Sequence, residues 1–448
     1  MEPDEAVLTV FREAAKSVPA YRQLLREAGV RPEEVRSLAD FRRRAPVLDK
    51  ACTFGRFPLA DLCRDGEVGR PAWVLTSSGQ SGRFAFGVYD EDTGEAAYRR
   101  IDDALDAFFA VRSRRTLLIN ALPMGVKVYT RECTLAETSV RDDMVVALVK
   151  TFGGHFDQVI LVAEAAFVKR VLELGRAEGV DWHGLPVHVV VGEEPLAENA
   201  RILFEAALGI EPGRPETGMV ISTMGVGELG LNLFFETPPL MALRRTLHRD
   251  AALRGAVLGP DARCVPMLFA YDPRRTFVEL VDGNRLAVTM LDPSRRVPLI
   301  RYATGDRAAP LEPTPALLEA VAQAGLTPEH LGAMPTLMVL GRGRGVRAGQ
   351  TLVTPEQVKE ALYADADLAS ATTANFRLRS GVEAAEVLVQ LAPGVAAERG
   401  LADRFRLALA RYVSAPVALS CIPYEAFPYG MALNYERKFD YLELEPAE

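Results

Sequence analysis

Apolar residues recur at helical spacing through the first fifty residues, and Gly29 and Pro46 mark the ends of two predicted helical stretches. Farther along the chain, short apolar runs bounded by turn residues predict buried strands, and helical patterns follow several of them. The predicted strands cover 73–76, 116–120, 159–162 and 187–191, and predicted helices cover 165–177 and 196–208. This alternation favours an α/β fold with a large, doubly wound and mostly parallel sheet.

The pattern changes after Gly230, where strand-like runs follow one another with turns such as D-G-N between them. These runs cover 232–236, 264–271, 276–281 and 285–291. They predict an antiparallel, barrel-like β subdomain at about 231–310. The glycine- and arginine-rich stretch 341–349 is the best linker in the sequence, and a compact α+β pattern follows it. We therefore expect an N-terminal domain of residues 1–340 and a small, hinged C-terminal domain of residues 341–448.

Composition narrows the function classes. A chain of 448 residues with 49% apolar and 25% charged residues is typical of a globular protein with two or three domains. The net charge of −8 offers no basic field for nucleic acid or an anionic membrane, and no apolar run is long enough for a membrane span. Five cysteines without a C-x-x-C pair fit neither a disulfide framework nor a zinc site. The acidic N-terminus does not resemble a signal peptide, so we expect a cytoplasmic protein.

Two loops after predicted strands have the composition of nucleotide-binding loops. The stretch L-T-S-S-G-Q-S-G-R-F (75–84) offers backbone N–H groups and hydroxyls to an anion, although it is not a Walker A loop. G-E-E-P (192–195) follows the strand V-H-V-V-V, where a glycine lets a flat ligand approach the backbone. Either stretch, taken alone, is also typical of an ordinary turn.

Three later segments carry charged residues suited to nucleotide chemistry. Glu228 in S-T-M-G-V-G-E-L-G is a natural magnesium ligand beside phosphates, and Asp306 in R-Y-A-T-G-D can hold both hydroxyls of a ribose. Lys438 lies between tyrosines near the C-terminus. Each of the three is individually also typical of a turn or a solvated surface.

Hydrolase motifs are absent from the sequence, which contains neither H-E-x-x-H nor G-x-S-x-G. Apolar segments at 121–130 and 152–156 are candidate walls of a substrate pocket. Their aromatic residues suit contact with an aryl group, and they are equally typical of an ordinary apolar core. The candidate pocket residues are Tyr129, Phe152, Gly153, Gly154, His155 and Val226.

The order of these segments resembles that of the adenylate-forming superfamily, and most closely its phenylacetate–CoA ligase branch. S-S-G-Q-S-G resembles the S-S-G-T-T-G of that branch, and G-E-E-P resembles its G-A-E-P. P-L-I-R-Y-A-T-G-D resembles P-x-I-R-Y-R-T-G-D, and residues 21–41, followed by Pro46 and Lys50, resemble the N-terminal segment of the branch. The likeness spans nearly the whole chain.

The resemblance implies a role for each motif residue. Thr76, Ser77, Ser78, Gly79, Ser81 and Gly82 would hold the β- and γ-phosphates of ATP, and Arg83 would supply the charge of a lysine found elsewhere in the family. Gly192, Glu193, Glu194 and Pro195 would border the adenine, with Met224 in place of a stacked tyrosine and Gly225 after it. Asp306 would bind the ribose, Arg342 ribose or phosphate, and Glu228 Mg²⁺, while Lys438 would enter the site for adenylation.

The implied activity is ATP-dependent activation of a small, aromatic carboxylic acid to acyl-AMP, followed by transfer to CoA, by a monomer or homodimer. Departures from the family keep alternatives open: Gln80 replaces a threonine, R-F-A replaces the x-P-K or x-P-T ending of the loop, and Gly343-Arg344 replaces an acidic pair. Lys438 lacks a glycine before it, so Tyr435 and Arg437 are also candidates for entering the site. One alternative is transfer of the acyl group to an amine or another nitrogen nucleophile. A second alternative, of another class, is a non-catalytic nucleotide-binding homologue.

Overall fold

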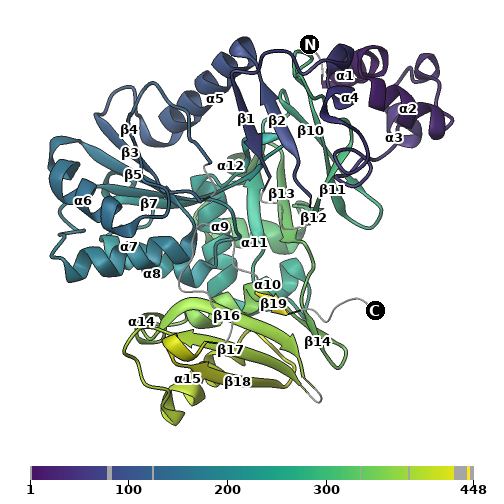
Figure 1. The fold of residues 1–448 in the computed structure, drawn as a ribbon. Helices are drawn as coiled ribbons and strands as arrows, with labels where there is room; N and C mark the ends of the chain where they lie inside the picture. The colour runs from purple at the N-terminus through teal and green to yellow at the C-terminus, as the bar shows by residue number, and fades with distance from the viewer. Residues whose placement is uncertain are drawn as a thin grey trace.

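The computed structural model describes residues 3–77, 83–123, 126–332, 334–381, 384–427 and 441–443. The chain begins with a helical segment at one end of the molecule (Figure 1). Its helices are α1 (Pro3–Ser17), α2 (Pro19–Glu27), α3 (Leu38–Arg44) and α4 (Leu59–Leu62). Phe11 of α1 meets Phe41 of α3 edge to face at 5.6 Å, and Phe41 meets Phe277 of a later strand at 6.2 Å. The segment is thereby packed onto the sheet.

Eleven strands form one sheet in the order β10-β11-β12-β13-β9-β8-β7-β6-β5-β3-β4. The strands of its parallel half are β3 (Thr116–Asn120), β4 (Thr134–Glu137), β5 (Gln158–Ala163), β6 (Val187–Val191) and β7 (Gly218–Val226). Helices connect these strands, which confirms the predicted α/β class. The strand at 73–76 differs from its prediction: β1 (Trp73–Thr76) is only partly buried and pairs with β2 (Phe86–Tyr89) in a separate two-stranded sheet.

The other half of the sheet is antiparallel. It contains β8 (Gly230–Phe235), β9 (Met267–Ala270), β10 (Thr276–Val281), β11 (Arg285–Met290), β12 (Tyr302–Pro310) and β13 (Thr336–Gly341). The residues predicted as a barrel-like subdomain thus continue the large sheet from β7 onward. Helices α9 (Pro238–Arg249), α10 (Ala251–Leu258), α11 (Pro315–Gln323) and α12 (Pro328–Gly332) lie between these strands in sequence.

Side chains of the parallel strands alternate between two apolar cores. On β5, Val159 and Leu161 belong to a core with α6 (Asp142–Phe152), α7 (Ala165–Ala177) and α8 (Glu198–Leu208), whereas Ile160 and Val162 belong to a core with α5 (Glu91–Phe109). Because both faces of the strand are covered, all six of its residues are buried.

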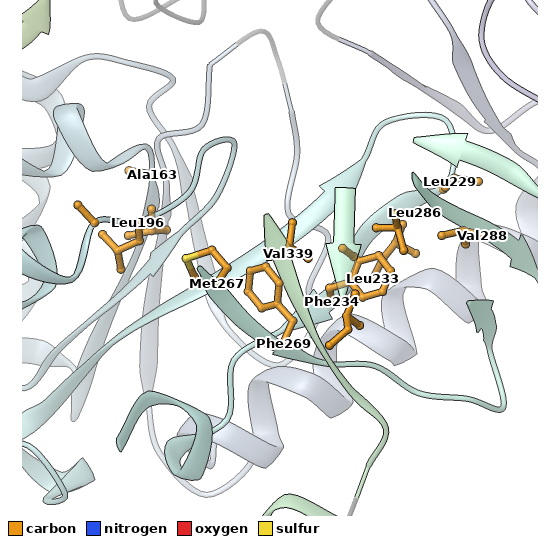
Figure 2. Packing of buried hydrophobic residues seen from close by; sticks show 14 of the residues in the cluster. Ala163, Leu196, Leu229, Leu233, Phe234, Met267, Phe269, Leu286, Val288 and Val339 are labelled. Carbon is orange, nitrogen blue, oxygen red and sulfur yellow. The ribbon is translucent and has the colours of Figure 1, made fainter. Parts of the chain in front are cut away.

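Figure 2 shows part of the larger core, which crosses from the parallel half of the sheet to the antiparallel half. Its labelled side chains are Ala163, Leu196, Leu229, Leu233, Phe234, Met267, Phe269, Leu286, Val288 and Val339. The two halves therefore share one apolar interior. In the described part of the chain, no helix is both long enough and apolar enough to cross a membrane.

The residues after Gly341 form a separate sheet at the bottom of Figure 1. Its strands are β16 (Thr372–Ser380), β17 (Ala385–Leu391), β18 (Val417–Ile422) and β19 (Leu442–Glu443), in the order β18-β17-β16-β19. The hairpin β14 (Val346–Ala348)–β15 (Thr351–Val353) precedes it, and α13 (Pro355–Leu362), α14 (Ala366–Ser370) and α15 (Arg399–Leu409) accompany it. Leu442 pairs with Leu378 of β16, which brings the described end of the chain back toward the N-terminal part.

Candidate functional site

A cavity of about 1010 Å³ opens at the carboxyl ends of the parallel strands. Its walls come from the residues after β3 and β6, the end of β7, strands β8 and β12, helix α5 and the C-terminal part of the chain. This edge of a parallel sheet is where ligands bind in α/β folds, because the strands end there and loops diverge. The volume suits a ligand the size of a nucleotide.

One end of the cavity is a polar cluster made by Lys50, Ser77 and Glu228. The Nζ of Lys50 donates to the Oγ of Ser77 at 3.0 Å and lies 3.9 Å from Oε1 of Glu228. The hydroxyl of Tyr302 donates to the same Oε1 at 2.6 Å, and burial together with the Glu228 carboxylate raises the pKa of Tyr302 far above its usual value. A cation, a hydroxyl and a buried carboxylate therefore meet where the predicted phosphate loop begins.

Glu228 is only 3% exposed, and its Oε2 has no hydrogen-bond partner among the described residues. A buried carboxylate oxygen without a partner is costly, so the position suits a bound cation. The described residues contain no cluster of three or more His, Cys, Asp or Glu side chains that could hold a metal by themselves. The donor set fits Mg²⁺, which proteins bind through one or two carboxylates plus substrate phosphates.

Gly227 explains how Glu228 comes so close to the phosphate loop. A Cβ on Gly227 would lie 2.6 Å from the carbonyl oxygen of Thr76 and 2.9 Å from the nitrogen of Ser77. Both are backbone atoms, and only glycine lets the β7–β8 turn approach the end of β1 so closely. The second glycine of G-V-G-E is thus required for close packing against β1 as well as for the turn.

The opposite side of the polar region contains the residues expected around adenine and ribose. Gly192 to Pro195 line the cavity directly after β6, together with Met224, Gly225 and Val226 at the end of β7. Asp306 accepts a hydrogen bond from Thr304 at 3.0 Å, and the Nε of Arg342 lies 3.7 Å from its Oδ1. Four motifs that are far apart in sequence therefore line one cavity.

The remainder of the cavity is an apolar chamber between α5 and the parallel strands. It is lined by Ile101, Ala104, Leu105, Phe108, Phe109, Leu122, Val126, Val128, Val162, Val190, Ile221 and Phe235. Most of these residues belong to the core that α5 forms with the sheet. The chamber can take an apolar group whose polar end faces Lys50 and Glu228.

The C-terminal part closes one side of the cavity with charged residues. Lys359 of α13 forms an ion pair with Glu194, and its Nζ lies 4.4 Å from the centre of the Tyr441 ring. The Tyr441 hydroxyl donates to Glu194 at 3.2 Å, and burial beside that carboxylate raises the pKa of Tyr441 well above its usual value. Arg377 of β16 also lines the cavity. The G-E-E-P segment after β6 is therefore held by two residues from the C-terminal part of the chain.

Several predicted site residues lie elsewhere. Phe152, Gly153, Gly154 and His155 precede β5, at the amino edge of the sheet, and do not line the cavity. The prediction that these four residues line the substrate pocket is therefore wrong, because a loop before a parallel strand emerges at the edge opposite the ligand site. Tyr129 lines a separate, smaller cavity.

The predicted phosphate loop begins at the cavity wall. Arg83 is exposed beside Gly55 and does not line the cavity, whereas Thr76 and Ser77 do. Ser78, Gly79, Ser81, Gly82 and Lys438 lie outside the described residues.

Sequence reasoning missed Lys50 as a site residue and missed the wall formed by α5. Lys50 appeared only as part of a resemblance, although the scarcity of lysine, seven in the chain, could have drawn attention to it. Ile101, Leu105 and Phe108 had the ordinary spacing of a core helix, which does not distinguish a core from a chamber wall. No recognisable motif surrounds Lys359 in the sequence, so nothing there indicated that it would line the cavity.

Comparison with known proteins gives similarity in structure only, since no family model and no curated protein sequence matches the chain. A structure of 2-hydroxyisobutyryl-CoA ligase in the postadenylation state, in complex with 2-HIB-AMP, matches with a TM-score of 0.67 and 15% identity. The match covers 98% of this chain and 88% of the ligase chain. The ligase with 2-HIB-AMP and CoA in the thioesterification state matches with a TM-score of 0.52 and 16% identity, over 99% and 89% of the two chains. The chain therefore has the fold of this CoA ligase.

Proposed function

We propose that this chain, which has the fold of an acid–CoA ligase, is an ATP-dependent ligase that acts in the cytoplasm. It activates a carboxylic acid as acyl-AMP, releases pyrophosphate and then passes the acyl group to CoA. The observation that supports this most is the single cavity in which Lys50, Ser77 and Glu228 lie between a nucleotide-sized polar region and an apolar chamber.

The first reaction needs two anions to be brought together. An oxygen of the acid attacks the α-phosphorus of ATP, a new O–P bond forms, and the bond to the bridging oxygen of pyrophosphate breaks. No proton has to be transferred. The protein's contribution is to position the reactants and to stabilise the charge on the phosphates. Lys50 supplies a cation at the start of the phosphate loop, and Asp306 and Arg342 orient the ribose side.

Glu228 is the residue that would hold Mg²⁺, because its Oε2 is buried without a partner. The ion would neutralise phosphate charge. Tyr302 keeps the carboxylate oriented by its hydrogen bond to Oε1.

The acid's apolar part occupies the chamber between α5 and the sheet. Phe108, Phe109 and Phe235 line the chamber together with branched aliphatic residues, which suits a small aromatic acid. The phenylacetate–CoA ligase branch remains the prediction that fits this chamber best.

The C-terminal domain, residues 341–448, is proposed to change orientation between the two reactions. The chain superposes better on the postadenylation state of the related ligase than on its thioesterification state, with TM-scores of 0.67 and 0.52. This supports an orientation suited to the first reaction. Rotation about residues 341–349, which include Gly343 with a φ of 61°, would then expose the cavity to CoA.

A nitrogen nucleophile is the second candidate acceptor. It is motivated by the departure from the family at the hinge, where Gly343-Arg344 replaces an acidic pair and Arg344 lines the cavity.

The test is a screen for pyrophosphate release across aryl and alkyl acids, with and without CoA. We expect release with at least one aryl acid and formation of its CoA thioester. Pyrophosphate release without any thioester, together with amide formation when amines are added, would favour the second candidate. If no acid releases pyrophosphate and calorimetry detects no ATP binding, the chain is a non-catalytic homologue.

A further inference from the structure

A second cavity, of about 130 Å³, lies next to the apolar chamber. We call it the arginine cavity, because Arg100, Arg275 and Arg295 are among its lining residues. It shares with the main cavity the residues Leu75, Ile101, Leu231 and Asn232. The two cavities are therefore neighbours with a common wall.

The arginine cavity carries more positive than negative charge. Arg100, Arg274, Arg275 and Arg295 line it, whereas Asp292 is its sole lining carboxylate. Arg274 is largely neutralised outside the cavity, with its Nε 3.0 Å from Asp272. Three guanidinium groups then remain for one carboxylate, and the contact between Arg100 and Asp292 is loose, at 4.0 Å.

Arg275 is the residue whose charge is least compensated. Within the described part of the chain, its partly buried side chain makes no hydrogen bond and no ion pair. Burial and the neighbouring Arg100 lower the pKa of Arg275 to about 10. Asp272 attracts Arg275 without forming a direct ion pair, so the partly buried guanidinium is incompletely compensated, and an anion between it and Arg100 would reduce the cost.

The other walls keep the site rigid. Trp73 stacks on Tyr89 with ring centres 5.5 Å apart, and Tyr129 lies 4.7 Å from Trp73. Arg295 lies over the Tyr89 ring at 5.5 Å and donates to the carbonyl oxygen of Glu228 at 3.1 Å. The position of Arg295 is thereby fixed, and the arginine cavity is connected directly to the proposed metal ligand.

We propose that the arginine cavity binds an anionic oxygen group, a carboxylate or a phosphate. The cavity is too small for a nucleotide, since ligand sites for larger molecules occupy about 300–1,000 Å³. Two sources can supply the group: the far end of the acid being activated, which would make the substrate a diacid, or a free inorganic anion. The first source rests on the proposed function, whereas the second does not.

Binding can be measured without activity, because Trp73 lines the cavity and the chain has only two tryptophans. Trp182 is buried and donates to the carbonyl oxygen of Leu172, away from the cavity lining, so Trp182→Phe leaves Trp73 as the sole tryptophan, which is excited selectively at about 295 nm or above. In this background we would titrate inorganic phosphate, terephthalate and benzoate in the absence of ATP. We expect a saturable change in Trp73 emission with phosphate or terephthalate, and an affinity at least tenfold lower in Arg275→Gln.

The matched control is Arg285→Gln, which removes the same charge from an exposed pair with Asp282 on the neighbouring strand. It should leave the titration unchanged. If Arg275→Gln does not fold, Arg100→Gln serves the same purpose. An emission change that is equal in wild type and in both cavity variants, or no change with either dianion, would overturn the proposal.

Kinetics distinguishes the two sources. If the group belongs to the substrate, terephthalate releases pyrophosphate and Arg275→Gln raises its KM at least tenfold, with little effect on the KM for benzoate. If phosphate binds through Arg275 and terephthalate does not, the source is a free anion. Phosphate binding in a protein that activates no acid would leave the anion site standing and reject the proposed ligase function.

Discussion

At the residue scale, Lys50 is a cation that lies at the beginning of the predicted phosphate loop. It reaches both the start of the phosphate loop and the carboxylate of Glu228 from a segment that is 27 positions before Ser77 in the chain. Sequence position alone cannot bring these groups together. Their meeting depends on the N-terminal helices packing against the antiparallel end of the sheet.

We predict that Lys50→Met lowers the rate of acyl-AMP formation by about 100-fold, as expected for loss of one positioned charge in a water-poor site. Methionine keeps most of the side-chain volume, so the fold should be retained. The measurement is acid-dependent pyrophosphate release. Lys150→Met, on the exposed surface of α6, is the control, and an equal loss in both variants would contradict the role of Lys50.

At the element scale, the β7–β8 turn and the end of β1 are coupled through Gly227. We predict that Gly227→Ala destabilises the protein by about 1–3 kcal/mol and raises the KM for ATP, because the added Cβ meets two backbone atoms. Chemical unfolding and initial rates measure the two effects.

Gly154→Ala is the control for this substitution, since a Cβ there meets no atom within 4 Å. It should leave both the stability and the KM nearly unchanged. A large effect of Gly154→Ala on the KM would restore the 152–155 loop to the site.

Strand β6 carries a buried pH-sensitive group. His188 is 1% exposed, its Nε2 lies 3.1 Å from Gln158, and burial lowers its pKa to about 4. The unfolded chain has the ordinary value of about 6.5, so it binds the proton first as the pH falls. Above about pH 6.5, His188 does not lower the free energy of unfolding. Between pH 6.5 and pH 4, protonation of the unfolded chain lowers the free energy of unfolding by about 3 kcal/mol at most.

We therefore predict that His188→Gln reduces the slope of unfolding free energy against pH between pH 6.5 and 4. Denaturant unfolding at several pH values checks this. His330→Gln, an exposed substitution, should leave the slope as in wild type. Identical slopes in all three proteins would show that His188 does not contribute.

At the scale of the whole molecule, a carboxylate from the C-terminal part of the chain caps helix α8. Glu360 of α13 is 2% exposed and accepts from the backbone N–H groups of Glu198 and Asn199, at 2.8 and 3.0 Å. These groups begin α8 and have no partner within that helix. Asn199 also donates to the hydroxyl of Tyr412, at 2.7 Å.

We predict that Glu360→Ala weakens docking of the C-terminal domain by about 2 kcal/mol, because two buried N–H groups lose their acceptor. Faster proteolysis within 341–349 and a larger radius in small-angle scattering measure the change. Glu386→Ala, which breaks a half-buried pair with Arg379 inside the C-terminal part, is the control and should change neither the proteolysis rate nor the radius. Unchanged proteolysis in Glu360→Ala would mean that other contacts hold the domain.

The sequence by itself determined the α/β class, and it predicted a glycine-rich connection at 341–349 and several segments that line the cavity. Local patterns suffice for these features, because buried parallel strands are continuous apolar runs and because loops after such strands meet at one edge of the sheet. Gly192, Glu228 and Asp306 were selected by the order of the motifs and the resemblance that it carries; the structure places all three along one cavity, and their roles stay predictions. The same reasoning misplaced Phe152 to His155, since an apolar loop gives no indication of the edge at which it emerges.

Only the tertiary structure decided which distant residues complete the site. Lys50, Arg377 and Lys359 come from three separate segments, and no local pattern relates them to Ser77 or Glu194. The arginine cavity depends in the same way on α5, the turn before β10 and the loop after β11 lying side by side. The physical reason is that periodicity reports whether a side chain is buried, whereas the groups that it meets are set by the packing of whole elements.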